Sequence, residues 1–254
     1  MENKRYALIT GAGSGIGQIT AIELARNGYH VVFHYNRSKE PAEEAVREVI
    51  ENGGSADIIQ ANIREISEIE RMFAEYKERF GRLDLFINNS GVTKGAHFLN
   101  VTEDIFDEVC EINWKGAYFC VQGAGRIMAE QENGGNIVII SSNHAVTQFI
   151  NGSAYGSMKA ALVKLTRHAA IELAKYNIRV NTLAPGWVDH PRVSEKGRER
   201  VNKIIPLKRW CKPEDIAHMI MFLDGDYAKS ITGNCIIMDG GAQLISVPIE
   251  EYGL

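Results

Sequence analysis

The chain has 254 residues, of which 45% are hydrophobic and 24% are charged, as in an ordinary globular domain. Its formal net charge is −4 and it has no long basic run, which argues against nucleic-acid binding. The four cysteines show no Cys-x-x-Cys spacing, so they indicate buried thiols in a reducing compartment rather than a disulfide framework or a zinc site. No secretory or membrane-spanning stretch is recognisable, and we expect a cytoplasmic protein.

Short apolar runs alternate with longer amphipathic segments along the chain. Strands are expected at 6–10, 30–34, 56–60, 83–88, 136–141, 178–184 and 234–238. Helices are expected at about 15–27, 41–51, 67–80, 102–131, 153–176 and 213–223. Strands separated by helices indicate right-handed βαβ units. The sequence therefore predicts an α/β fold: a single-domain, Rossmann-type, doubly wound parallel sheet with helices on both faces, spanning 1–254.

The least regular segment lies at 187–205. It is rich in charge, and its first part, 187–203, lacks a strong apolar period. Two interpretations stay open: a solvated surface loop, or a lid over a substrate site.

A glycine-rich turn, Thr10–Gly17, joins the first expected strand to the first expected helix. Its glycines at Gly11, Gly15 and Gly17 are spaced G-x-x-x-G-x-G, which differs from the G-x-G-x-x-G fingerprint. Such a turn lets a phosphate approach backbone N–H groups at a helix N-terminus. A nucleotide site is predicted here, although a methyltransferase or a purely structural turn could use the same glycines.

Tyr155 and Lys159 lie four residues apart, so they share one face of an expected helix. A phenol titrates near pKa ~10, and a nearby ammonium favours the phenolate. Ser142, thirteen residues before the tyrosine, is a candidate second hydrogen-bond donor. The spacing alone also arises by chance in many helices, so these residues need support from the rest of the chain.

Taken together, these motifs resemble the classical short-chain dehydrogenase/reductase family. The matching features run in the family order over nearly the whole chain: Thr10–Gly17, Asn88–Gly91, Asn113, Ser142, Tyr155, Lys159, Pro185-Gly186 and Asp239–Gly241. The resemblance implies a nicotinamide cofactor held by Gly11, Ser14, Gly15, Ile16, Gly17, Tyr35, Arg37, Ser38, Asn62, Asn89, Gly91, Tyr155, Lys159, Pro185, Gly186 and Val188.

The resemblance also implies roles for four catalytic residues. Tyr155 would exchange a proton with the substrate oxygen, and Lys159 would lower the pKa of that tyrosine and hold the nicotinamide ribose. Ser142 would bind the same oxygen, and Asn113 would help to hold a water linking the lysine to solvent. Two alternatives stay open: Asn113 could bind backbone inside a helix, and Ser141 could face the site in place of Ser142.

The choice of cofactor depends on the segment after the second strand. Tyr35 occupies the position where NAD-specific relatives have an acidic residue, and Arg37 and Ser38 could hold a 2′-phosphate. NADP(H) is therefore predicted, with NAD(H) possible. The alternative is that Arg37 is an exposed loop arginine. One observation argues against NADP(H): Ser14 stands where many NADP-preferring relatives have a basic residue.

Residues 93–97, 143–150 and 187–193 are expected to border the substrate. The candidates there are His144, Gln148, Phe149, Trp187 and His190, a mixture that suits a small or medium carbonyl compound with polar substituents. His190 stands where relatives commonly have a threonine near the nicotinamide amide. The histidines show no metal-binding spacing, so no metal is expected.

The leading hypothesis is an NADP(H)-dependent oxidoreductase that interconverts a carbonyl and a secondary alcohol. Residues 205–216 resemble 3-oxoacyl-carrier-protein reductases, so a 3-oxoacyl-thioester reductase is the alternative enzyme. A catalytically idle nucleotide-binding regulator is the alternative of another class. The resemblance further implies a homotetramer that pairs the two long helices, with apolar Phe119, Val121, Leu162, Leu165 and Ile171 either on such faces or in the core.

Overall fold

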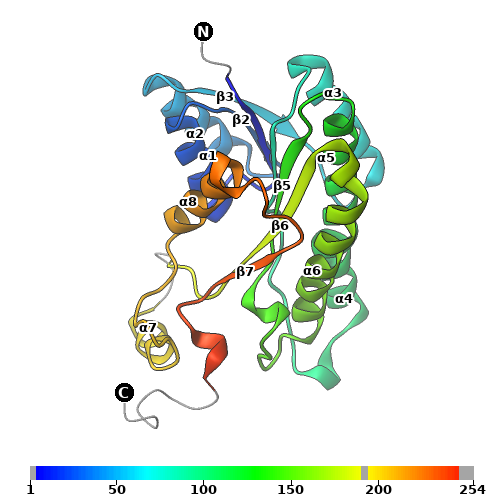
Figure 1. Cartoon of the computed structure of the whole chain (residues 1–254). Helices are drawn as coiled ribbons and strands as arrows, with labels where there is room; N and C mark the ends of the chain where they lie inside the picture. Colours follow the sequence, from blue (N-terminus) through cyan, green and yellow to red (C-terminus); the bar gives the residue numbers. More distant parts are fainter. Residues whose placement is uncertain (1–3, 190–193, 246–254) are drawn as a thin grey trace.

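A seven-stranded parallel sheet forms the centre of the molecule in the computed structural model, which describes residues 4–189 and 194–245 (Figure 1). The strands lie in the order β3-β2-β1-β4-β5-β6-β7. Their bounds are β1 (Tyr6–Ile9), β2 (His30–Tyr35), β3 (Ser55–Gln60), β4 (Leu85–Asn88), β5 (Gly135–Ile140), β6 (Ile178–Pro185) and β7 (Cys235–Met238). The predicted doubly wound Rossmann-type sheet is confirmed.

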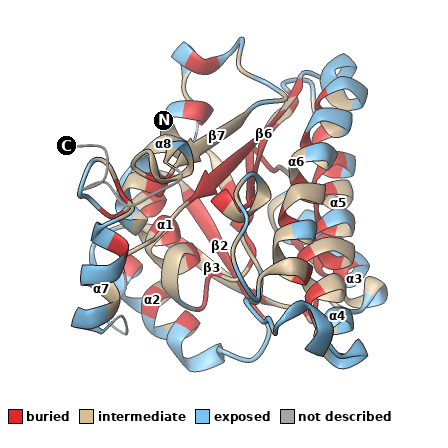
Figure 2. Ribbon diagram, turned by 90° about the horizontal axis from the view of Figure 1, so that it is seen from below, coloured by how far each residue is buried: buried red, intermediate tan, exposed pale blue. Residues whose placement is uncertain are grey.

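Helices cover both faces of this sheet (Figure 1). One face packs against α1 (Gly15–Arg26), α2 (Lys39–Glu51) and α8 (Pro213–Asp224), and the other against α3 (Ile66–Phe80), α5 (Ala117–Ala129) and α6 (Ser153–Leu173). Successive strand residues point to opposite faces, so Leu8 and Ile9 enter different cores. The strands β1, β2, β4, β5 and β6 are largely buried on both sides, which explains their continuous apolar runs. The outer strands β3 and β7 are partly exposed, as the tan colour of β7 in Figure 2 shows.

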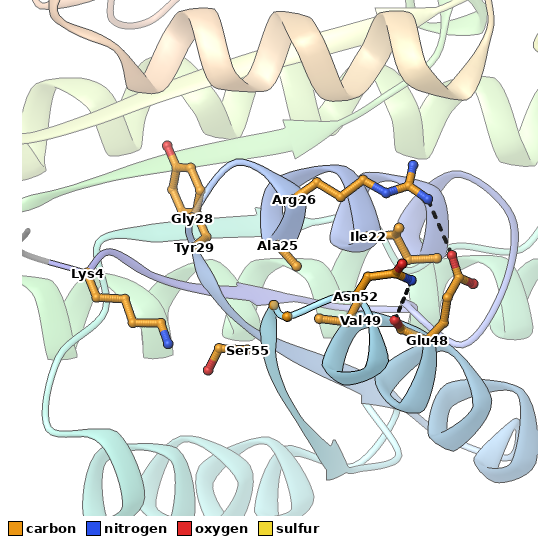
Figure 3. Close-up of a pocket in the computed structure, with 12 residues that line it drawn as sticks. Lys4, Ile22, Ala25, Arg26, Gly28, Tyr29, Glu48, Val49, Asn52 and Ser55 are labelled. Atoms are coloured by element: carbon orange, nitrogen blue, oxygen red, sulfur yellow. Dashed lines mark hydrogen bonds and ion pairs between the residues drawn. The ribbon is translucent and has the colours of Figure 1, made fainter.

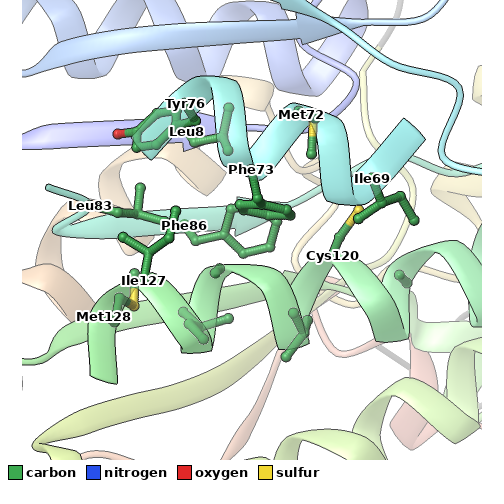
Figure 4. Packing of buried hydrophobic residues seen from close by; sticks show 14 of the residues in the cluster. Leu8, Ile69, Met72, Phe73, Tyr76, Leu83, Phe86, Cys120, Ile127 and Met128 are labelled. Atoms are coloured by element: carbon green, nitrogen blue, oxygen red, sulfur yellow. The ribbon is translucent and has the colours of Figure 1, made fainter. Parts of the chain in front are cut away.

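The core between α3 and α5 contains Phe73 and Phe86, which Figure 4 labels. Phe73 of α3 meets Phe86 of β4 edge to face, with ring centroids 5.7 Å apart. A Cβ at Gly123 would stand 2.4 Å from the Phe73 ring, so only glycine lets α5 approach this closely. The close approach fixes the helix layer that carries Asn113 and leads to the active-site edge.

The predicted long helix over 102–131 is wrong as a single α-helix. Thr102 caps α4 (Glu103–Cys110) as expected, accepting a hydrogen bond from the Ile105 N–H at 3.3 Å. A π-helical segment, Glu111–Gly116, then separates α4 from α5. A Cβ at Gly116 would lie 2.5 Å from the carbonyl oxygen of Ile63, so this segment packs directly on the loop after β3.

The segment predicted to be irregular contains a helix, α7 (Glu195–Asn202). Ser194 caps it by accepting from the Gly197 N–H at 3.2 Å, and Val201 is buried against Trp210. A short capped helix with one buried side chain has too weak an apolar period to be recognised in sequence. His190 lies outside the described residues.

The order of the strands places the candidate site. The connection after β1 leads to β2 on one side, whereas β4 lies on its other side, so a crevice opens at the carboxyl ends of β1 and β4. Among the described helices, none is both long and apolar enough to cross a bilayer.

Candidate active site

The glycine-rich turn lies at the crevice between β1 and β4. Gly11 and Gly15 have positive φ values of 69° and 58°, a conformation that favours glycine. A Cβ at Gly17 would stand 2.5 Å from Asn89 Nδ2, whereas a Cβ at Gly15 would meet nothing within 4 Å. Asn89 Nδ2 also donates to the Thr10 carbonyl oxygen at 2.9 Å. The turn thus packs closely against Asn89, whereas the space beside Gly15, at the N-terminus of α1, is open.

A cavity of about 500 Å³ runs from this turn along the ends of β2, β3 and β4. Its lining includes most of the predicted cofactor residues: Gly11, Ser14, Ile16, Tyr35, Arg37, Ser38, Asn62, Asn89 and Gly91. Ser14 and Ser38 stand at the N-caps of α1 and α2, and neither side chain caps its helix. Both hydroxyls and both helix dipoles are therefore available to anions. Backbone N–H groups, open space and polar side chains together fit a dinucleotide.

Tyr155 and Lys159 meet on the first turns of α6, where the Lys159 Nζ lies 5.6 Å from the centroid of the tyrosine ring. Lys159 is buried and its Nζ donates to the Ile140 carbonyl oxygen at 2.9 Å. Burial lowers the pKa of Lys159 to about 8. No carboxylate is recorded as an ion-pair partner of this ammonium among the described residues. Its charge is therefore poised to interact with groups that enter the site.

The Ser142 and Thr93 hydroxyls lie beside the Tyr155 phenol, close enough to influence its pKa. Burial raises the pKa of Tyr155, and these two hydroxyls oppose that rise. The hydrogen bond of the Lys159 ammonium goes to the Ile140 carbonyl oxygen, and the lowering of the tyrosine pKa by Lys159 stays a prediction. Thr93 belongs to the segment 93–97 that was expected to border the substrate, but its contact with the Tyr155 phenol was not predicted, since no spacing or motif marks it.

The choice between the two neighbouring serines follows from their contacts. Ser141 Oγ donates to the Lys159 carbonyl oxygen at 2.8 Å and so ties β5 to α6. Ser142 faces the other way and contacts Tyr155. The alternation of the strand end thus places Ser142 at the site.

Asn113 lies in the π-helical segment and is fully buried. Its Oδ1 accepts from the Val92 N–H and its Nδ2 donates to the Val92 carbonyl oxygen, both at 2.8 Å. A Cβ at Gly91 would lie 3.0 Å from Asn113 Oδ1 and 3.5 Å from Lys159 Nζ. The side chain therefore binds backbone, as the alternative interpretation held, and supports the segment that carries Thr93.

Aromatic rings extend from Tyr155 toward α7. His144 meets Tyr155 edge to face, with centroids 5.2 Å apart, and stacks on Phe149 at 4.0 Å. Phe149 in turn meets Trp187, whose centroid is 5.9 Å away, and Trp187 packs in the cluster that contains Trp210. Burial lowers the pKa of His144. These rings form a largely uncharged wall beside the phenol.

A second cavity, of about 480 Å³, adjoins this wall. Predicted substrate residues His144, Gln148 and Phe149 line it together with His97 and Ile150. Four of the five predicted substrate residues are thus connected by ring contacts or a shared cavity: His144, Gln148, Phe149 and Trp187.

The end of β6 carries the remaining predicted cofactor residues. Pro185 is the last residue of the strand, and the Gly186 N–H donates to the Met238 carbonyl oxygen at 3.0 Å. A Cβ at Gly186 would stand 2.5 Å from that of Asp239, so this turn requires glycine. Val188 forms an isolated bridge with Cys211 and lies outside the cavity lining described above.

The opposite edge of the sheet has a smaller hollow of about 220 Å³ (Figure 3). Arg26 there lies 3.4 Å from Glu48, and Asn52 Nδ2 donates to the Glu48 carbonyl oxygen at 2.8 Å. In the described part of the chain, no group of three or more His, Cys, Asp or Glu residues could hold a metal ion.

A family profile described as Enoyl-(Acyl carrier protein) reductase matches residues 11–243. The chain belongs to the short-chain dehydrogenase/reductase family. It is 37% identical over 244 residues to 3-oxoacyl-[acyl-carrier-protein] reductase FabG of Staphylococcus aureus, covering 95% of this chain and 99% of that protein. The corresponding enzyme of Synechocystis is 34% identical over 238 residues and is covered to 96%, with 93% of this chain matched.

Solved structures of the same family have the same fold. A protein described as a short-chain alcohol dehydrogenase from Sinorhizobium meliloti superposes with a TM-score of 0.89 at 36% identity, covering 95% of this chain and 97% of that one. Acetoin dehydrogenase from Enterobacter cloacae gives a TM-score of 0.87 at 34% identity, with coverage of 96% and 98%. As a short-chain dehydrogenase/reductase, this chain is an oxidoreductase that uses a nicotinamide cofactor and acts on a small molecule.

Proposed function

We propose that this short-chain dehydrogenase/reductase interconverts a carbonyl compound and a secondary alcohol with NADP(H). The observation that carries the proposal is the Tyr155 phenol, which lies beside the Ser142 hydroxyl and has the Lys159 Nζ 5.6 Å from the centroid of its ring. This group lies at the same edge of the sheet as the dinucleotide cavity. A proton donor and a cation beside a developing alkoxide are what carbonyl reduction requires.

The residues divide the work as follows. A bound reduced nicotinamide supplies the hydride that adds to the carbonyl carbon. Tyr155, kept protonated by its raised pKa, donates its proton to the carbonyl oxygen, and Ser142 donates a hydrogen bond to the same oxygen. Lys159 stabilises the phenolate that is left. In alcohol oxidation the proton moves in the opposite direction, to a Tyr155 phenolate.

Preference for NADP(H) is supported by the end of β2 and the start of α2. Tyr35 supplies no carboxylate that would repel a 2′-phosphate. Arg37 and Ser38 line the cavity, and the Ser38 hydroxyl makes no capping hydrogen bond to α2, so both can bind the phosphate. The test is parallel fluorescence titration of wild type and Arg37→Gln with NADPH and NADH. Arg37→Gln should weaken NADPH binding about tenfold and leave NADH binding within about twofold.

Arg47, an exposed arginine of α2 outside the cavity lining, gives the matched control. Arg47→Gln should change neither affinity. Equal wild-type affinities for NADPH and NADH would contradict the preference.

A 3-oxoacyl thioester is the second candidate substrate, because the Staphylococcus aureus and Synechocystis relatives are named for that activity. A carrier-protein reductase needs basic residues for docking on an acidic partner. Near the end of α5 this chain has exposed Glu130, which pairs with Lys77 at 2.5 Å. Comparing kcat/KM for an acetoacetyl thioester with that for a small hydroxyketone decides between the two. A preference of tenfold or more for the thioester would replace our first choice.

We also propose a homo-oligomer that forms through α5 and α6. Between these helices lies a cavity of about 720 Å³ lined by Tyr118, Leu165 and Tyr176 among others, and Ile171 is 79% exposed. Of the residues predicted for such a face, Val121 and Leu162 are instead buried in the core, while Phe119 and Leu165 are partly buried. Light scattering at micromolar concentration tests the assembly. The tetrameric state and the cytoplasmic location stay predictions.

A further inference from the structure

His34 is a buried histidine that borders the dinucleotide cavity and lies outside the catalytic group. It is 1% exposed and is the fifth residue of β2. Its Nδ1 accepts a hydrogen bond from the Gly11 N–H at 3.0 Å, and its Nε2 lies 3.0 Å from the Ala61 carbonyl oxygen. A nitrogen that accepts from an N–H carries no proton itself. The single proton of the ring is therefore on Nε2 and is donated to Ala61.

The ring stays in this neutral tautomer because burial lowers the pKa of His34 to about 4. Protonation would put a second N–H at Nδ1, facing the Gly11 N–H, and would break that hydrogen bond. The imidazole is thus a fixed bridge with one donor and one acceptor.

The bridge connects three successive strand ends. Gly11 belongs to the turn after β1, and Ala61 follows β3 directly and precedes the cavity residue Asn62. The backbone continues the connection, since the Ala12 N–H donates to the His34 carbonyl oxygen at 2.8 Å and the Ala61 N–H to that of Tyr35 at 3.1 Å. The Gly11 carbonyl oxygen accepts from Asn89 Nδ2 at 3.3 Å, so the Gly11 peptide is held from both sides.

We propose that His34 is a positioning residue that holds the glycine-rich turn (Thr10–Gly17) and the loop after β3 (Ala61 and Asn62) in register before the cofactor arrives. It acts through Gly11 and Ala61 and not on the substrate. A turn held in its binding geometry loses less conformational freedom when the dinucleotide binds, and this raises affinity. The inference rests on the nicotinamide-nucleotide site of the proposed function and on no choice of substrate.

The same strand offers a matched control at its other end. His30 lies four residues earlier and points to the same face of the sheet. Its Nδ1 is 2.7 Å from Ser55 Oγ, and it is 7% exposed. Substituting either histidine removes a buried imidazole from β2, but only one of them contacts the cavity wall.

The test measures the Kd of NADPH by fluorescence, and kcat at saturating NADPH, for His34→Leu and His30→Leu. His34→Leu leaves the Gly11 N–H and the Ala61 carbonyl oxygen without their partner, so its Kd should rise about tenfold while kcat stays within about twofold. His30→Leu should leave Kd within about twofold. Equal Kd values for wild type and His34→Leu, or an equal rise in His30→Leu, would overturn the inference.

Two conservative variants separate the two hydrogen bonds and serve if His34→Leu does not fold. An asparagine places its amide oxygen near the position of Nδ1, and a glutamine places its amide nitrogen near that of Nε2. If the contact with Gly11 matters more, His34→Asn should bind NADPH more tightly than His34→Gln. If both variants keep the fold and both bind NADPH about tenfold more weakly than wild type, the result also supports the bridge. Wild-type affinity in both would overturn it. Failure of the wild type itself to bind either dinucleotide would overturn the proposed function, and this inference with it.

Discussion

The two edges of the sheet each bury a charged side chain, but they surround it differently. At the carboxyl edge Lys159 is 4% exposed, and only burial shifts its pKa. At the amino edge Asp224 is 5% exposed and receives hydrogen bonds from Arg5 at 2.9 Å, Tyr29 at 2.6 Å and Asn136 at 3.3 Å. Burial raises the pKa of Asp224, but these three donors and Arg179 oppose the rise.

The difference shows how a structural charge can be told from a functional one. A buried charge that neighbouring groups stabilise connects elements of the fold, here the segments before β1 and β2 with α8. Within residues 4–189 and 194–245, the one hydrogen bond of the Lys159 ammonium is to a carbonyl oxygen. Such a buried charge destabilises the protein unless a ligand completes its surroundings. Mutations at the two edges should therefore change different properties.

The largest expected effect is at the carboxyl edge. Tyr155→Phe removes the proton that carbonyl reduction consumes, so kcat/KM should fall by about 10³-fold. The NADPH Kd should stay within about twofold, since the ring and its packing are kept. Steady-state kinetics and fluorescence titration measure the two quantities. Turnover within tenfold of wild type would contradict the role of Tyr155.

At the amino edge, Asp224→Asn should lower the free energy of unfolding by about 3 kcal/mol, because Arg5 and Tyr29 lose the carboxylate they bind. Urea denaturation at one protein concentration measures this change. The kcat of the folded variant should equal that of wild type, and a selective loss of kcat would remove the contrast between the edges.

Lys159→Met should reverse the sign of that stability effect. Burial lowers the lysine pKa from 10.5 to about 8, which lowers the free energy of unfolding of the wild type by about 3 kcal/mol at neutral pH. The variant avoids this penalty but loses the hydrogen bond to Ile140, which contributes about 1 kcal/mol. At pH 7 the variant should thus be about 2 kcal/mol more stable than wild type, yet inactive. Because the folded pKa lies below the unfolded one, the penalty is full below pH 8 and disappears as pH rises toward 10.5. Urea denaturation at pH 7 and pH 10 checks both the sign and the trend; a less stable variant at pH 7 would show that Lys159 is structural.

The smallest expected effect concerns space beside the lysine. Gly91→Ala puts a Cβ 3.0 Å from Asn113 Oδ1, so the Asn113 side chain must shift by a few tenths of an ångström, whereas Lys159 Nζ at 3.5 Å stays in ordinary contact. We expect kcat to fall about threefold to tenfold through this misplacement. Gly225→Ala, where the nearest atom would be at 3.4 Å near the amino edge, is the control and should leave kcat unchanged. A similar kcat in both variants would show that the fit around Gly91 does not matter.

Most of the fold was predictable because its strands are continuous apolar runs between turn residues, and their predicted and observed bounds differ by at most two residues. The π-helical segment was not, since it depends on contacts of Asn113 with Val92 and of Gly116 with Ile63, residues remote in sequence. Helix α7 was missed because its capping serine and single buried valine give almost no periodic signal.

Site residues could be predicted where they stand at a characteristic spacing in the sequence, and could not where no other residue marks them. Tyr155 and Lys159 share a helix face, and strand alternation with a fixed gap favoured Ser142. Thr93 has no motif, and the histidine bridge at His34 requires knowing which strands are neighbours. Burial raises the pKa of Tyr155, and spacing in the sequence does not reveal burial.

The π-helical segment between α4 and α5 acts as a phase shift. One additional residue per turn rotates everything downstream by about 100° relative to a continuous α-helix. Asn113 can therefore bind Val92. The apolar side of α5 can still pack against α3. Deleting one residue from 111–116 would restore a regular helix and turn one of these faces out of place. The widened turn thus lets the catalytic edge and the outer surface of α5 vary separately during evolution.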